Sequence, residues 1–156
     1  MKSFMAILVS AIYLLACQVK QIEPANLTGE WRYVGNFSHL ADYRCIICPE
    51  FDYDKSIYRF TVQEDNTFST RINLLIGNGK ISTTPKESTA NTWMGDFRIT
   101  DLQILNKPYE TQADSDFKEN FQKAYNYYMS NQNSTTYDQL NLTYEANSYL
   151  VFVRRK

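Results

Sequence analysis

The chain is poor in glycine and proline, with five and four of them among 156 residues, and it has a single histidine, His39. Low glycine and proline argue against a disordered or low-complexity chain. Neither sign of charge dominates, since 16 basic side chains face 17 acidic ones. A nucleic-acid-binding protein would need a basic face, and the only basic cluster is the chain end, residues 154–156. The composition therefore predicts a globular protein with no nucleic-acid partner.

No apolar run is long enough to cross a membrane as a helix. Residues 4–15 form an apolar run of about a dozen residues, where roughly 20 are needed. This run follows Lys2 and leads into Leu14-Leu15-Ala16-Cys17, which resembles the lipobox of bacterial lipoproteins. The resemblance implies cleavage before Cys17 and acyl chains on that residue, and such chains anchor a protein to a membrane. An ordinary secretory peptide or an apolar first strand is the alternative.

These features predict three parts of the chain: a lipoprotein signal peptide over 1–16, a polar tether over 17–26, and one globular domain over 27–156. Gln18 directly follows the lipobox cysteine. Some Gram-negative bacteria use an aspartate there to retain lipoproteins in the inner membrane. The sequence therefore predicts a protein of the bacterial cell envelope, lipid-anchored in the outer membrane and facing the periplasm.

Alternation of apolar and polar residues is typical of half-buried strands. It predicts strands over 29–37, 57–63, 68–76, 80–84, 92–99, 102–105, 137–145 and 149–155. Gly77-Asn78-Gly79 predicts a tight hairpin turn, and a helical period of apolar residues predicts a helix over 114–129. The expected fold is α+β: a curved antiparallel β-sheet or partly open barrel with one main α-helix.

The order of several short motifs resembles the META domain family, also called HslJ-like. Its opening Leu-x-Gly-x-Trp is matched by Leu27-Thr28-Gly29-Glu30-Trp31, and its closing apolar-Phe-x-Arg strand by Val151-Phe152-Val153-Arg154. The family's Gly-Cys-Asn triplet is absent, with Arg71-Ile72-Asn73 in its place. The resemblance implies an envelope or stress-related role without a known enzymatic reaction. Lipocalin-like lipoproteins also open with Gly-x-Trp and stay the alternative.

Six aromatic residues on the predicted strands are candidates to line a cavity for an apolar small molecule or lipid. They are Trp31, Tyr33, Tyr58, Phe60, Trp93 and Phe97. Simple core packing is the other interpretation. The sequence thus predicts a non-enzymatic, lipid-anchored protein that binds an envelope component or has a structural role, with a lipocalin-like carrier as the alternative.

The pair Cys45 and Cys48 allows three kinds of chemistry. A thioredoxin-type site would need a helix start, which Pro49 disfavours at Cys48. Zinc would need about four ligands, and no second closely spaced pair exists. A local disulfide in an oxidising compartment is the interpretation we favour. We expect no metal, no cofactor and no catalytic residues.

Overall fold

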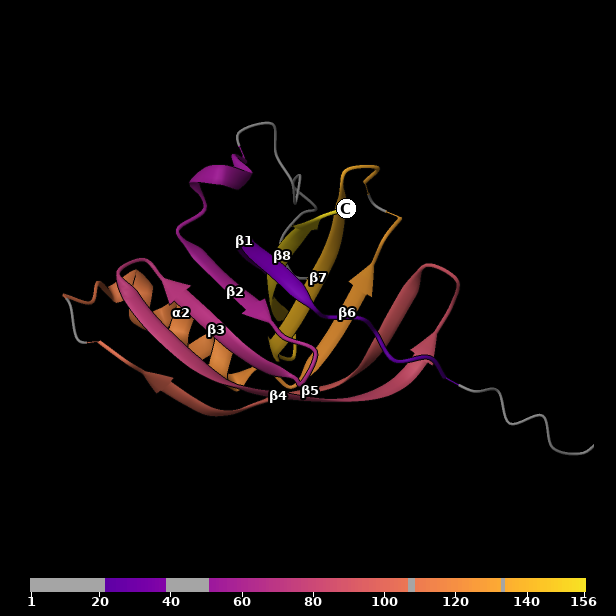
Figure 1. Ribbon diagram of the computed structural model, residues 1–156. Helices are drawn as coiled ribbons and strands as arrows, with labels where there is room; N and C mark the ends of the chain where they lie inside the picture. Colours follow the sequence, from indigo (N-terminus) through magenta and orange to yellow (C-terminus); the bar gives the residue numbers. More distant parts are fainter. Residues whose placement is uncertain (1–21, 39–50, 107–108, 133) are drawn as a thin grey trace, which may run out of the picture.

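The structure is a computed structural model that describes residues 22–38, 51–106, 109–132 and 134–156 (Figure 1). Within these residues, eight antiparallel strands follow sequence order around a closed barrel, because β1 pairs with both β2 and β8. The elements are β1 (Gly29–Ser38), the 3-10 turn η1 (Tyr53–Lys55), β2 (Tyr58–Val62), β3 (Thr67–Ile72), β4 (Leu75–Ser88), β5 (Thr92–Ile104), the helix α2 (Gln112–Lys123), β6 (Asn126–Ser130), β7 (Tyr137–Glu145) and β8 (Ser148–Arg155). This confirms the predicted α+β fold, a barrel with one main helix.

The register between strands brings their apolar faces together. Trp31 on β1 pairs with Phe60 on β2, and Val62 pairs with Phe68 on β3. Paired residues lie on the same face of an antiparallel sheet, and every second residue along a strand points the same way. One short alternating pattern per strand therefore suffices to line the inside of the barrel.

The last strand, β8, is buried on both faces. Phe152 points inward, whereas its neighbours Val151 and Val153 point outward and are also fully buried. The η1 turn lies on the outer side of this region, where the ring of Tyr53 stacks on that of Tyr137 at 5.6 Å between centroids. An outer layer on the barrel explains why the final strand reads as a continuous apolar run.

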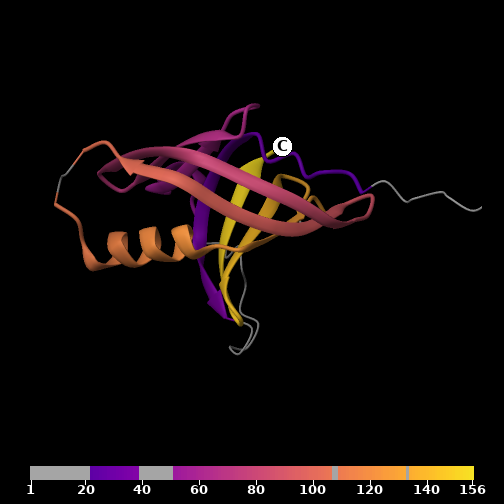
Figure 2. The ribbon, with the colours of Figure 1, turned by 90° about the horizontal axis from the view of Figure 1, so that it is seen from below.

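The two strands of the β4–β5 hairpin, with 14 and 13 residues, are the longest in the barrel. The hairpin pairs with β3 through β4 and with β6 through β5. Its residues 75–80 pair with β3, whereas only Thr92–Asp96 at its far end pair with β6. The rest of β5 has no partner in β6, and α2 packs beside it (Figure 2). The helix thus covers the part of the wall that the strands leave open, and it brings Phe117 and Phe121 into the core.

The predicted turn at Gly77-Asn78-Gly79 is wrong, because these residues lie inside β4. The turn between β3 and β4 lies instead at residues 73–74, where Asn73 has a φ of 55°. The glycines serve close packing: a Cβ on Gly79 would lie 2.8 Å from the ring of Phe68. Glycine marks close approach as well as turns, and the sequence alone does not separate the two uses.

Two further boundaries differ from the prediction. The expected break between 92–99 and 102–105 is a bulge inside one strand, where Asp101 has a φ of 55°. The helix ends at Lys123 instead of continuing to Met129. Residues 126–130 form β6, in which Tyr127 and Met129 are buried at alternate positions. Over this short stretch, residues that fit a helical period fit a strand equally well.

Gly95→Ala is expected to lower the free energy of unfolding by about 1–3 kcal/mol. A Cβ there would lie 2.2 Å from the backbone oxygen of Thr84, so the hairpin would have to shift. Gly35→Ala is the matched control, because its Cβ would meet the far end of the Phe37 ring, which can move. Urea denaturation of both variants tests this expectation. An equal or larger loss for Gly35→Ala would contradict it.

Candidate functional site

Aromatic rings fill the centre of the barrel. The ring of Phe60 lies 5.0 Å from that of Phe152 and 5.2 Å from that of Phe121, measured between centroids. Phe68 lies 5.8 Å from Phe121, and Phe117 lies 5.7 Å from it, one helical turn earlier. All five side chains are buried. The helix therefore contributes two rings to a packed aromatic cluster between β2, β3 and β8.

The six residues predicted to line a ligand cavity all belong to this core or pack against it. Trp31, Phe60 and Phe97 are at most 2% exposed. The other three, Tyr33, Tyr58 and Trp93, are partly buried at the edge of the core. The packing interpretation describes this placement well, and a role in ligand binding stays a prediction.

Arg154 lies at the end of the barrel where β1 begins. Its guanidinium carbon is 4.5 Å from the centroid of the Trp31 ring, and its Nη2 donates to Asp138 Oδ2 at 2.7 Å. Its Nη1 donates to the backbone oxygens of Asn26 and Thr28. One partly buried cation thus ties the first strand, the last hairpin and the N-terminal segment together.

A buried carboxylate, Asp114, lies at the end of the barrel where β2 begins. It accepts hydrogen bonds from Tyr58 Oη at 2.8 Å, Thr111 N at 2.9 Å and Asn73 Nδ2 at 3.4 Å. Burial raises the pKa of Asp114, but these hydrogen bonds outweigh it and leave the pKa below its usual value. Burial, followed by the bond to Asp114, raises the pKa of Tyr58 to about 12. The ring centroid of Tyr33 lies 5.7 Å from that of Tyr58. Burial likewise raises the pKa of Tyr33 to about 12.

The Asp114 cluster therefore has the chemistry of a helix cap and a structural anchor. Thr111 and Asp114 form a capping box, in which each side chain accepts from the other residue's backbone N–H. Two tyrosines with high pKa values stay protonated near neutral pH, so neither is a ready proton acceptor.

Asp114→Asn is expected to cost about 1–2 kcal/mol of unfolding free energy at pH 7, since the amide keeps one acceptor oxygen but loses the other and the negative charge. A carboxyl whose pKa is lowered in the folded state stabilises it above the unfolded pKa of about 3.9, and the stabilisation disappears as the pH falls through the folded pKa. The gap between wild type and variant should therefore narrow below about pH 4. Urea denaturation from pH 7 to pH 3 measures it, with the exposed neighbour Asp116→Asn as control. A gap that stays constant would contradict this role.

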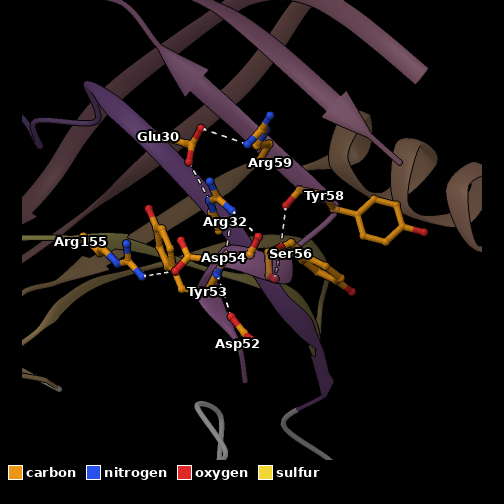
Figure 3. A network of polar contacts seen from close by, with 10 residues as sticks. Glu30, Arg32, Asp52, Tyr53, Asp54, Ser56, Tyr58, Arg59 and Arg155 are labelled. Carbon is orange, nitrogen blue, oxygen red and sulfur yellow. Dashed lines mark hydrogen bonds and ion pairs between the residues drawn. The ribbon is translucent and has the colours of Figure 1, made fainter. Parts of the chain in front are cut away.

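On the outside of the barrel, Tyr53 lies between two arginines (Figure 3). The guanidinium carbons of Arg32 and Arg155 are 4.7 Å and 4.3 Å from its ring centroid. Arg32 Nη1 also donates to Tyr53 O at 2.9 Å, and Arg155 Nη2 donates to Asp54 Oδ2 at 2.8 Å. The network fixes η1 on the outer face of β1 and β8.

The same network begins a row of arginines across the outer wall. Arg32, Arg59 and Arg71 are directly paired on β1, β2 and β3. Glu30 contacts the first two, at 2.7 Å and 3.6 Å. Like charges directly opposite each other destabilise a sheet. The row cannot be recognised from the sequence alone, because only the strand register brings the three residues together.

Grooves on the outer surface offer hydrogen-bonding groups. One, of about 440 Å³, crosses β3, β4 and β5 and is lined mainly by amide and hydroxyl side chains. Its polar lining includes Gln63, Thr67, Ser69, Asn78, Lys80, Asp101 and Gln103. Another, of about 610 Å³, lies between the end of α2 and the β4–β5 hairpin and borders Phe97. Within the described residues, no three His, Cys, Asp or Glu side chains are placed to hold a metal ion.

Several predicted residues fall outside the part of the chain that the structure describes. These are the signal peptide 1–16, Cys17, His39 and the pair Cys45 and Cys48. Lipidation and the disulfide therefore stay predictions. No helix among the described residues is both long and apolar enough to span a membrane.

No family model matches the chain, and no curated protein matches it. A solved structure of a DUF4847 family protein from Bacteroides vulgatus is similar, with 16% identity and a TM-score of 0.48. The similarity covers 83% of this chain and 94% of that one. The META-like resemblance stays a prediction.

Proposed function

We propose that this protein is a lipid-anchored, non-enzymatic domain of the bacterial cell envelope that binds another envelope component through its outer surface. The observation that carries this proposal is the packed interior, in which Phe117 and Phe121 of α2 meet Phe60, Phe68 and Phe152. A binding domain whose centre is filled by its own side chains must use its outside.

The alternative is a carrier that holds an apolar ligand inside the barrel. A carrier would need free volume between the strands, and the cluster of rings at 5.0–6.3 Å occupies the centre. Opening such a space would require α2 to withdraw, which would expose two buried phenylalanines and break the bonds of Asp114 to Tyr58 and Asn73. The filled barrel therefore supports a surface function better than carriage.

The buried polar groups also support a non-enzymatic role. Asp114 and Asp138 are the most buried carboxylates in the described chain. The first is occupied by a helix cap and Tyr58, and the second by Arg154. Both carboxylates therefore hold segments of the fold together, which is a structural role.

The start of the domain is compatible with an anchor at Cys17. Residues 22–24 and Asn26 are exposed, and Glu23 N donates to Ser88 Oγ at the tip of the β4–β5 hairpin. The chain therefore enters the domain from the outside (Figure 1). An acylated cysteine five residues before Ile22 could stay in a membrane without disturbing the barrel.

Membrane fractionation of cells that express wild type and Cys17→Ala tests the anchor. Wild type should be found in the membrane fraction, and its denatured mass should equal residues 17–156 plus lipid. Cys17→Ala should lose both the lipid and the membrane association. A wild-type protein that is soluble and carries no lipid would overturn the anchor.

A further inference from the structure

Four large apolar side chains gather, strongly exposed, at one end of the barrel. Ile57, Leu74, Ile76 and Leu105 are 52%, 53%, 50% and 60% exposed. They come from the start of β2, the β3–β4 turn, β4 and the end of β5. Single exposed apolar residues are ordinary, but a contiguous group marks an interaction surface.

Hydrogen bonds hold these segments beside one another. Asn73 N donates to Ile57 O at 3.0 Å, and Leu105 N donates to Ile76 O at 2.8 Å. Asn106 Nδ2 donates to Leu74 O at 2.8 Å. The four side chains therefore belong to a well-defined surface formed by three neighbouring segments.

Two arginines border this surface. Arg71 pairs directly with Ile76 on one side and with Arg59 on the other. Arg71 is exposed; its Nε donates to Asn73 O at 3.0 Å, and no ion pair joins it to a described residue. Arg59 is one-third exposed and has Glu30 at 3.6 Å. Both guanidiniums keep donors available for an anion.

We call these six residues the apolar–arginine face: Ile57, Arg59, Arg71, Leu74, Ile76 and Leu105. It occupies a hairpin tip and the outside of a barrel, so it protrudes. A protruding apolar surface beside cations suits a deformable apolar phase with an anionic border, and a phospholipid bilayer is such a phase. Arginine also matches phosphate geometry, because its planar fork can donate two parallel hydrogen bonds.

The position of the face relative to the N-terminal segment decides how the domain could meet a bilayer. The face lies at the Leu75 end of β4, whereas Glu23 is bonded to Ser88 at the other end. The 14 residues of β4 span roughly 45 Å along the strand. The five Cα–Cα steps from Cys17 to Ile22 reach at most about 18 Å. The short tether therefore holds the Ser88 end of β4 close to the bilayer. The apolar–arginine face at the Leu75 end reaches the same bilayer only when β4 lies along its surface.

We propose that the apolar–arginine face rests on a phospholipid surface that carries anionic phosphates, so that the domain lies flat beside its own anchor. This inference rests on the proposed anchor at Cys17.

The test uses the mature chain, residues 17–156, with Cys17→Ser, so that binding cannot come from acyl chains. Co-sedimentation with phosphatidylglycerol–phosphatidylcholine vesicles should exceed that with pure phosphatidylcholine at least about tenfold. Arg59→Gln/Arg71→Gln should weaken binding to the anionic vesicles about 30-fold, since each basic side chain near such a surface contributes roughly a factor of five. Leu74→Ser/Leu105→Ser should weaken it about tenfold or more.

Lys86→Gln/Arg98→Gln is the matched control. This variant also removes two positive charges, from exposed positions on the other half of the β4–β5 hairpin. It should change binding to the anionic vesicles less than about threefold. An equal loss in this control, or unchanged binding of the leucine variant, would overturn the proposal. Acylated wild type in the membrane fraction, together with no vesicle binding by Cys17→Ser, would leave the anchor intact and assign the face to a protein partner. Binding by Cys17→Ser without acylation of wild type would support the face and overturn the anchor.

Discussion

Replacing Phe121 with alanine is expected to lower the free energy of unfolding by about 3–5 kcal/mol, the usual cost of removing a fully buried phenylalanine. Phe121 is 0% exposed and lies between 5.2 Å and 6.0 Å from the rings of Phe60, Phe68, Phe117 and Phe152. Its loss leaves a cavity that the strands can only partly close. Equilibrium denaturation in urea measures the change.

Tyr109→Ala is the control for Phe121→Ala, since Tyr109 is 82% exposed. It should change the free energy of unfolding by less than about 0.5 kcal/mol. A loss below about 1 kcal/mol for Phe121→Ala would mean that the helix is not packed into the barrel, and the account of a filled interior would fail with it.

Arg154→Met is expected to cost about 2–4 kcal/mol. The substitution leaves the Asp138 carboxylate, which is 9% exposed, without its cation, and a buried charge that loses its partner is strongly destabilising. Lys156 Nζ, 4.0 Å from Asp138 Oδ1, replaces only part of that interaction. The contact with the Trp31 ring and the bonds to the N-terminal segment are lost at the same time.

Arg154→Lys keeps the charge but loses the planar fork, so its cost should lie between wild type and Arg154→Met. Arg98→Met, at an exposed position on β5, controls for the removal of an arginine. Thermal and urea denaturation of the three variants give the order. Equal stability of Arg154→Met and Arg98→Met would contradict the role of Arg154 in tying the first strand, the last hairpin and the N-terminal segment together.

Much of the barrel could be predicted from alternation alone. The final hairpin, expected over 137–145 and 149–155, is found as β7 and β8 within one residue, because Leu140 and Leu142 alternate with polar residues. The sequence predicts a turn at Gly77–Gly79, where the structure has a strand. The reason is physical: a glycine that lets Phe68 approach the backbone looks the same in sequence as a glycine that allows a turn.

The surface features could not be predicted in the same way, because they depend on register. Arg59 and Arg71 are twelve residues apart, and only their cross-strand pairing makes them neighbours. Ile76 and Leu105 fit apolar positions of buried strands, yet both face outward. The sequence predicts aromatic side chains for the interior. That α2 adds two rings to them follows only from the packing of the helix against β5 and β7.

Native mass spectrometry of the mature Cys17→Ser chain, produced in a bacterial periplasm, tests the filled barrel most directly. A filled interior should give the mass of the polypeptide alone, with no apolar adduct, and no change after incubation with a fatty acid. A stoichiometric lipid that stays bound in the native spectrum and is lost on denaturation would contradict a filled interior, and it would make the inside of the barrel the functional site.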